Sequence, residues 1–297
     1  MEALIFLGII AHLSGEYSRS KALLQEGLKI AQESKDDWFT AYAIYNLGYV
    51  DSMLEDYQQG YQQMVIGLDM WRSIGDLHYI ALGLNFLVST LIQLGRYEEA
   101  KTSMVESIAL CEQAKNRWGI GTAYRHLGLA AMAAGQIHDA KTHFRKSIDI
   151  FSGYAEEWHV AQSQVCLGEA EILDGNLSEA HSIYLNTLRM SINVKSIPIA
   201  MESLLGLASL EFEYGKPERA LEISHIVTRH PYISQEVRDR AIQMKMKSQL
   251  LLPDSNIQEI CDTASKWTMK EFVKRYKLDG IYLDSPDWGK IDDENGS

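Results

Sequence analysis

The chain has 297 residues, of which 46% are hydrophobic and 23% charged, and its formal net charge is −12. This composition can bury a globular core, and the acidic balance argues against a nucleic-acid-binding surface that spans the whole chain. The three cysteines, Cys111, Cys166 and Cys261, lie far apart without a CxxC pair. They predict buried thiols in a reducing compartment rather than disulfides or a zinc site.

The N-terminal stretch MEALIFLGIIAHLSGEY is apolar, but it carries Glu2 at once and is too short to span a bilayer. No other window approaches about 18 uninterrupted apolar residues. We therefore predict a cytoplasmic protein without membrane contact. Leu4, Ile5, Phe6 and Ile10 are very apolar for an exposed end. We expect either self-association through this end or a missing N-terminal domain, the chain then being the C-terminal part of a longer protein.

A leucine recurs every 40 residues, and we number positions within this period from Met1, so that these leucines stand at position 7: Leu7, Leu47, Leu87, Leu127, Leu167 and Leu207. Glycine or alanine fills position 8 in all periods but the third, and glycine fills position 15 in all but the second. Position 20 is small throughout: Ser20, Gly60, Ala100, Ala140, Ala180 and Ala220. A fixed period over about 240 residues is the signature of a solenoid.

Within each period the apolar residues recur at three- and four-residue steps, for example over 38–54 and 57–74, which predicts two helices. The glycine at position 15 separates them. The small residue at position 8 lets the paired helix approach, and the small residue at position 20 faces it. Each period is therefore expected to form an antiparallel helical hairpin.

The leucine-glycine pair, the turn glycine, the aromatic residue two positions later (Tyr17, Tyr57, Tyr97) and the alanine at position 20 resemble the tetratricopeptide repeat family over residues 1–250. The stretch LGRYEEA, residues 94–100, is close to a consensus run. The resemblance implies an all-α, right-handed superhelical solenoid of six hairpins over residues 1–230. A period of 40 instead of the common 34 is typical of the sensor domains of MalT-type bacterial transcriptional regulators, and it also occurs in peptide-sensing regulators.

The repeat fades after residue 230, where His230 and Pro231 mark a break. Helices are expected at about 234–251 and 255–266, with a last short helix over 268–276. We predict a degenerate C-terminal helical cap over 231–278 and an acidic, disordered tail over 279–297.

Catalytic and metal-binding motifs do not stand out. His138 and His143 are five residues apart on one predicted helix and point about 140° away from each other, so they cannot chelate one metal ion. His126 lies on the preceding helix, and we expect all three histidines at the surface. HExxH, Walker and GxSxG motifs are absent. The chain is predicted to be non-enzymatic, without metal or cofactor.

In such a repeat the first helix of each hairpin lines the concave surface, and positions 2, 5, 9 and 12–13 share one stripe. Tyrosines offer large contact area, an asparagine amide both donates and accepts, and Arg125 could hold a carboxylate. Peptide-sensing relatives use groove asparagines in this way. The predicted groove residues on or beside the stripe are Tyr42, Tyr45, Asn46, Tyr49, Asn85, Ser89, Gln93, Thr122, Arg125, Gln162 and Glu169.

The sequence therefore predicts a protein- or peptide-binding module, the sensory or scaffolding part of a bacterial signalling or transcription regulator. No direct contact with nucleic acid is expected. Three alternatives stay open: a small-molecule sensor, a self-assembling scaffold and a phosphatase-like regulator. A perturbed carboxylate or histidine cluster in the groove would favour the last.

Overall fold

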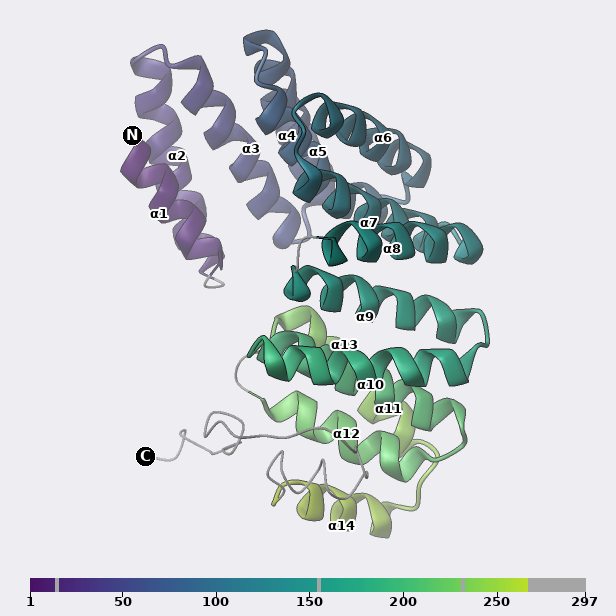
Figure 1. The fold of residues 1–297 in the computed structure, drawn as a ribbon. Helices are drawn as coiled ribbons and strands as arrows, with labels where there is room; N and C mark the ends of the chain where they lie inside the picture. The colour runs from purple at the N-terminus through teal and green to yellow at the C-terminus, as the bar shows by residue number, and fades with distance from the viewer. Residues whose placement is uncertain (14–15, 154–155, 231–232, 267–297) are drawn as a thin grey trace. The chain divides into compact units, whose positions relative to one another are not determined.

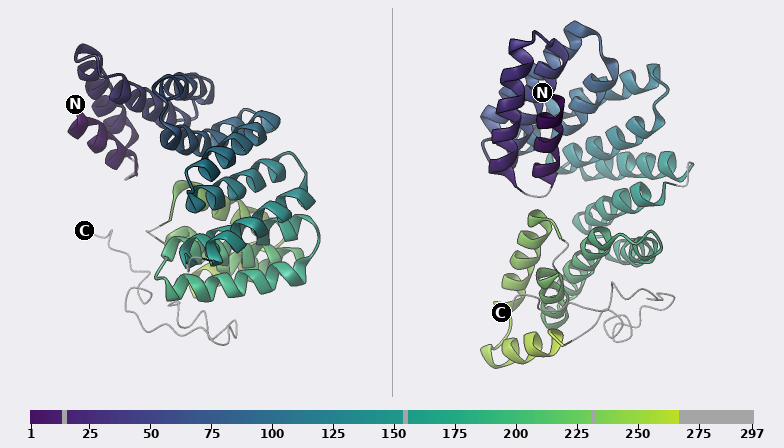
Figure 2. Two further views of the ribbon diagram at one scale, coloured as in Figure 1. Left: turned by 45° about the horizontal axis from the view of Figure 1, so that its top comes forward. Right: turned by 90° about the vertical axis from the view of Figure 1, so that its left-hand side faces the viewer.

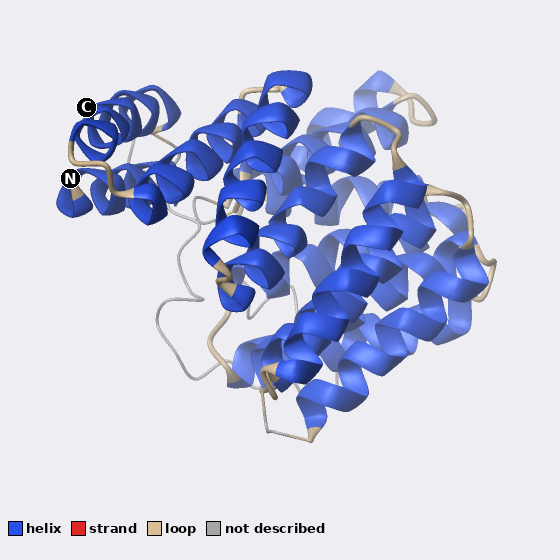
Figure 3. Ribbon diagram, turned by 90° about the horizontal axis from the view of Figure 1, so that it is seen from above, coloured by secondary structure: helices blue, strands red, loops and turns tan. Residues whose placement is uncertain are grey.

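The computed structural model describes residues 1–13, 16–153, 156–230 and 233–266, and every regular element in these ranges is an α-helix (Figure 3). They belong to two compact units, residues 1–150 and 151–297, and the boundary falls in the last turn of the eighth helix. The short helix expected over 268–276 and the acidic tail lie outside the described residues. The all-α repeat solenoid expected from the period is confirmed, while its right-handed superhelix stays a prediction.

The first unit is a stack of four antiparallel hairpins, which follow one another in Figures 1 and 2. Its helices are α1 (Glu2–Leu13), α2 (Tyr17–Glu33), α3 (Asp37–Met53), α4 (Tyr57–Ile74), α5 (Leu77–Gln93), α6 (Tyr97–Gln113), α7 (Arg117–Ala133) and α8 (Ile137–Ser152).

The second unit holds two further hairpins and a final helix pair: α9 (Glu157–Leu173), α10 (Leu177–Asn193), α11 (Ile197–Glu213), α12 (Pro217–Arg229), α13 (Gln235–Gln249) and α14 (Asp254–Ala264). Helix α13 packs on α11 and α12, and α14 packs on α12. Helix α13 thus contacts the preceding hairpin as a first helix does, although the segment after residue 230 lacks the sequence signature.

The 40-residue period appears directly in the helix starts. First helices begin at residues 37, 77, 117, 157 and 197, and second helices begin at residues 17, 57, 97, 137, 177 and 217. In three hairpins a side chain caps the first helix, because Asp36, Asp76 and Asn116 each accept a hydrogen bond from the backbone N–H three residues later. The polar residues that separate the repeats therefore set where each helix begins.

Both turns of the period use the left-handed backbone region. Inside the third to sixth hairpins the turn residue is glycine, with φ between +70° and +77°, and inside the second it is Glu55, with φ of +67°. Between hairpins no residue type recurs that would predict a left-handed turn. Even so, Lys35, Lys115 and Lys195 have φ of 53–56° and Gly75 has φ of 83°. Non-glycine residues tolerate this region at an energetic cost, so these lysines are a feature that the glycine pattern did not predict.

Position 8 brings the two helices of a hairpin together. A Cβ on Gly48 would lie 2.6 Å from the Gly60 carbonyl oxygen and 2.8 Å from the Met64 backbone nitrogen. In the fourth hairpin the space over Gly128 is filled by the ring of Phe144, 2.4 Å from an added Cβ. The predicted pairing of positions 8 and 20 thus holds at Gly48 and Gly60, whereas a ring at position 24 fills the space over Gly128.

The second unit contains a buried histidine between a lysine and a serine. Lys245 Nζ donates to His225 Nδ1 at 3.0 Å, and His225 Nε2 lies 2.9 Å from Ser265 Oγ. Because an ammonium group only donates, Nδ1 accepts, so Nε2 carries the hydrogen and donates to the serine. In this tautomer the imidazole cannot take a proton from Ser265, and the trio ties α12, α13 and the residue after α14 together instead of forming a nucleophile and base.

This histidine predicts a loss of stability in acid. Burial, and then the charges of Lys245 and Arg229, lower the pKa of His225 to about 4, against an opposing effect of Asp262. In the unfolded chain this histidine takes up a proton near pH 6.5. The free energy of unfolding is therefore unaffected by His225 above that pH, and it decreases as the pH drops toward 4. We expect a loss on the order of 2–3 kcal/mol from this one group.

Urea unfolding between pH 7 and pH 4 tests this, with His225→Gln as the comparison, since glutamine can accept from the lysine and donate to the serine but does not titrate. The variant should lose less stability in acid than the wild type. Equal losses in the two proteins would contradict the assignment.

Candidate binding pocket

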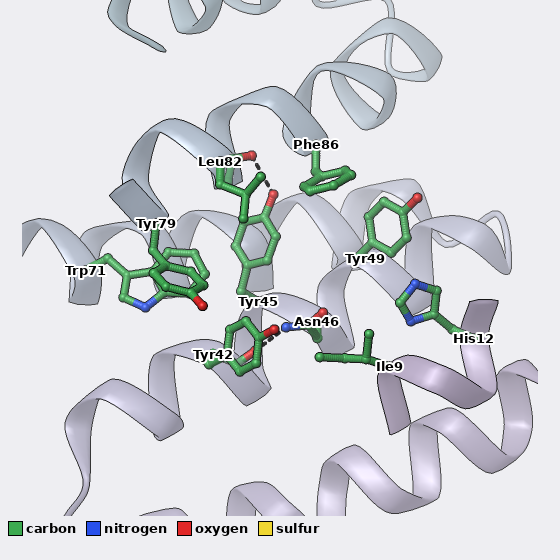
Figure 4. A pocket seen from close by; sticks show the side chains of 11 residues that line it. Ile9, His12, Tyr42, Tyr45, Asn46, Tyr49, Trp71, Tyr79, Leu82 and Phe86 are labelled. Carbon is green, nitrogen blue, oxygen red and sulfur yellow. Dashed lines mark hydrogen bonds between the residues drawn. The ribbon is translucent and has the colours of Figure 1, made fainter. Parts of the chain in front are cut away.

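The first unit contains an aromatic pocket of about 300 Å³ (Figure 4). Helices α1, α3 and α5 provide most of its wall, and Trp71 comes from the end of α4. These first helices also contact one another, α1 with α3 and α3 with α5. The lining residues are Ile9, His12, Tyr42, Tyr45, Asn46, Tyr49, Trp71, Tyr79, Leu82, Gly83 and Phe86.

The helical register explains which residues reach the pocket. Tyr42 and Leu82 share position 2, Asn46 and Phe86 share position 6, and Tyr49 and Ile9 share position 9. Steps of four and three residues keep these positions on one helix face. The inner stripe therefore includes position 6.

Position 5 contributes the buried floor of the site. Tyr45 is only 4% exposed, and its hydroxyl donates to the Gly83 carbonyl at 2.5 Å, which links α3 to α5. The ring packs on Trp71 with centroids 5.1 Å apart. Burial raises the pKa of the Tyr45 phenol well above its usual value. Tyr45 thus lines the pocket with its ring, while its hydroxyl is already engaged.

The rings of Tyr42, Trp71 and Tyr79 form one wall. Tyr79 meets Tyr42 edge to face at 5.5 Å, and Trp71 lies 5.3 Å from Tyr79 and 6.2 Å from Tyr42. On the other side Tyr49 meets Phe86 at 5.6 Å and His12 at 5.3 Å. Aromatic contacts of this kind constrain the orientations of the side chains, so the rings form two defined walls of the pocket.

Several polar atoms in the lining make no hydrogen bond within the described residues. Asn46 Nδ2 donates to the Tyr42 carbonyl at 2.7 Å, but its Oδ1 has no such partner. The hydroxyls of Tyr42 and Tyr79 also lack one, and His12 Nδ1 is buried and unpaired. Burial lowers the pKa of His12, so the imidazole is neutral at pH 7. Burial raises the pKa of both tyrosines, which stay protonated.

Four of the eleven predicted groove residues line this pocket: Tyr42, Tyr45, Asn46 and Tyr49. Asn85 does not, because it is 2% exposed and its Oδ1 accepts from Ser107 Oγ at 3.2 Å, between α5 and α6. Ser89 and Gln93 are exposed further along α5, and on α7 Thr122 is buried and Arg125 half-buried.

Gln162 and Glu169 belong to the second unit, where both are half-buried on α9. Glu169 accepts from Arg240 of α13 at 3.1 Å. Helix α13 also packs on α11. Glu169 on α9 is therefore already paired with a side chain of α13.

Seven lining residues were not among the predicted groove residues: Ile9, His12, Trp71, Tyr79, Leu82, Gly83 and Phe86. Ile9 and Leu82 stand in columns that the stripe already contained, and Phe86 shares its register with Asn46, so a stripe through positions 2, 6 and 9 would have found all three. Trp71 and Tyr79 come from the end of one hairpin and the start of the next, and no periodic pattern marks them.

The expectation of surface histidines is wrong for His126, which is buried, and its pKa is lowered well below the usual value by burial and then by the charge of Arg125. Among the described residues, no group of three histidine, cysteine or acidic side chains is placed to hold a metal ion. The same residues include no helix long and apolar enough to cross a membrane.

Comparison with known proteins identifies the repeat. Residues 79–153 match the model of the tetratricopeptide repeat. They include the third hairpin except its first two residues, and the whole of the fourth hairpin. The helix starts on both sides of this segment keep the same spacing of 40 residues. These residues belong to the tetratricopeptide repeat family. The resemblance expected from the sequence is thus confirmed over residues 79–153. Curated protein sequences gave no match.

Solved structures share the fold at low sequence identity. The aspartyl phosphate phosphatase F of Bacillus subtilis is 14% identical, with a TM-score of 0.66, over 95% of this chain and 72% of its own. A Rap protein solved with the competence and sporulation factor is 12% identical, with a TM-score of 0.63, over 89% and 75%.

A signal transduction ATPase with numerous domains from Pyrococcus horikoshii, which carries a tetratricopeptide repeat sensor, is 14% identical with a TM-score of 0.58. The match covers 89% of this chain but 38% of that protein. The chain therefore spans well under half the length of this larger protein.

Proposed function

We propose that the chain is a non-enzymatic module of the cytoplasm that binds a peptide or a short protein segment in the aromatic pocket of its first unit. The observation that carries this proposal is the wall of tyrosine, tryptophan and phenylalanine rings beside unpaired polar atoms. Tyrosine and tryptophan give large contact area for little loss of side-chain entropy. Convergent polar atoms in an otherwise apolar pocket fix the orientation of a ligand.

The surroundings of the pocket favour an extended ligand. Along α5 the exposed side chains of Phe86, Ser89 and Gln93 succeed one another at helical steps of three and four residues. They continue the inner face beyond the pocket rim. A peptide anchored by one side chain in the pocket could thus contact this polar row with its neighbouring residues.

We further propose that the module is the sensory or scaffolding part of a bacterial signalling or transcription regulator. The similar folds of a Rap protein and of a sensor-bearing signal transduction ATPase support this assignment. The pocket is shared by three hairpins, so a ligand that touches α1, α3 and α5 favours one relative placement of the three. A conformational bias of this kind can be passed to an attached effector.

Binding of defined peptides tests the site. Peptides selected from a random display library on the wild-type protein should bind an Asn46→Ala/Tyr49→Ala variant at least about tenfold more weakly, because buried anchors carry most of the free energy of binding at such sites. Fluorescence anisotropy of labelled peptides gives the dissociation constants, and far-UV circular dichroism verifies that the variant is folded.

The matched control is Ile66→Ala/Val105→Ala, which removes exposed apolar side chains from the second helices α4 and α6. It should leave the affinity unchanged. Equal binding by wild type and pocket variant, or a loss confined to the control, would move the site away from the pocket.

Two alternatives have an observation in their favour. A volume of about 300 Å³ also suits a small molecule, and a low-mass compound that raises the melting temperature would support a small-molecule sensor. The exposed side chains of Phe6, Leu7 and Ile10 on α1 suit self-association. Concentration-dependent mass in sedimentation would support that scaffold.

A further inference from the structure

The residues that line the pocket favour one chemical class of ligand. We propose that it is an aromatic cage for the cationic side chain of the bound peptide, an arginine or a lysine. This inference rests on the proposed function of the same pocket and specifies the anchor residue of the partner.

The first argument is the number and placement of the rings. Six aromatic side chains line a volume that suits one large side chain: Tyr42, Tyr45, Tyr49, Trp71, Tyr79 and Phe86. An aromatic face carries partial negative charge, and a cation within about 6 Å of a ring centroid is attracted to it. Figure 4 shows the rings distributed around the pocket rather than gathered on one side, so a single cation could meet several of them.

The second argument is the charge around the pocket. None of the lining residues is a lysine, arginine, aspartate or glutamate, and neutral His12 adds no repulsion. Residues 1–94, which contain the whole lining, hold eleven acidic and five basic side chains. Asp76 lies next to the lining residue Tyr79: its carboxylate accepts from the Tyr79 backbone N–H at 3.1 Å and from Trp38 Nε1 at 2.9 Å. The local field therefore favours a positive ligand.

The lining also offers acceptors that are unpaired within the described residues, although the buried Trp71 Nε1 is an unpaired donor. Asn46 Oδ1 can only accept, and the hydroxyls of Tyr42 and Tyr79 can accept as well as donate. A guanidinium presents five donors and no acceptor, and an ammonium presents three donors. A cationic side chain can satisfy these atoms while its alkyl stem lies against Ile9 and Leu82. A purely apolar side chain would bury the same atoms without partners, which is unfavourable.

Three probes of similar size separate these possibilities. N-acetyl-arginine methylamide carries the cation, N-acetyl-citrulline methylamide is its neutral isostere, and N-acetyl-phenylalanine methylamide is apolar. Titration followed by ligand-observed NMR should show the arginine probe binding at least about fivefold tighter than either of the others, the scale of a cation–π contact in a desolvated site.

The variant Phe86→Leu keeps apolar contact at the rim and removes one ring. It should weaken the arginine probe about threefold or more and leave the phenylalanine probe nearly unchanged. The matched control Tyr214→Leu removes an exposed ring in the second unit and should change neither. A smaller loss for the arginine probe than for the phenylalanine probe would count against the cage.

Tighter binding of the citrulline or phenylalanine probe, or no binding of the arginine probe at millimolar concentration, overturns the proposal. Library peptides that occupy the pocket without a basic residue overturn it too, and leave the proposed function standing. Binding of the arginine probe without binding of any peptide has the opposite meaning: the cage stands and the peptide function fails.

Discussion

Replacing Gly48 with alanine is expected to destabilise the first unit by about 3 kcal/mol, at the upper end of what overpacking a close-packed interior costs. The added Cβ would lie 2.6 Å from the Gly60 carbonyl oxygen and 2.8 Å from the Met64 nitrogen. Both are backbone atoms, so no side chain can turn aside, and α3 and α4 have to separate. Urea unfolding followed by far-UV circular dichroism measures the loss.

The matched comparison is Ala208→Gly, which makes the reverse change at the same position of the sixth period. It should cost only about 1 kcal/mol, the difference in helix propensity between the two residues. A Gly48→Ala variant that unfolds within about 0.5 kcal/mol of the wild type, the usual range for innocuous surface changes, would show that the helices are not held this closely.

Replacing Lys21 with methionine is expected to cost roughly 3–5 kcal/mol, because it leaves a buried carboxylate uncompensated. Asp51 on α3 is 1% exposed, and its two oxygens accept from Lys21 Nζ at 2.5 Å and from Gln59 Nε2 at 2.8 Å. The bond between Lys21 on α2 and Asp51 joins the first hairpin to the second. Removal of the ammonium leaves only the neutral amide to satisfy the charge.

The double variant Lys21→Met/Asp51→Asn should regain a large part of this loss, since no charge is then buried. Lys101→Met is the surface control: its partner Glu98 is 80% exposed, and exposed pairs contribute at most about 1 kcal/mol. The account of Asp51 would be wrong if Lys21→Met and Lys101→Met unfolded at the same urea concentration.

The fold was predictable from the sequence because the residues that determine it recur at a fixed spacing. Spacings of 40 residues between leucines, small residues and turn glycines place every hairpin, and the structure begins its helices at the same spacing. The turn at Lys35, Lys115 and Lys195 was not predicted, because lysine is no sequence signal for the left-handed conformation that these residues adopt.

The site was predictable only where it follows the period. Steps of three and four residues fit a stripe through position 5 as well as a stripe through position 6. The polar residues Asn85 and Arg125 stand at position 5, and they favoured the stripe through that position. Packing decides between them, since the Tyr45 hydroxyl finds its acceptor on α5 and Asn85 lies between two helices. Trp71 and Tyr79 reach the pocket through contacts between successive hairpins, which one repeat considered alone does not contain.

The most direct test of the pocket is photocrosslinking of a library-selected peptide that carries a diazirine group, with the attachment sites read by mass spectrometry. The account predicts crosslinks within residues 9–12, 42–49 and 79–86, which surround the pocket. Crosslinks confined to the second helices, for example at Ile66 or Val105, or to residues 151–266, would contradict it.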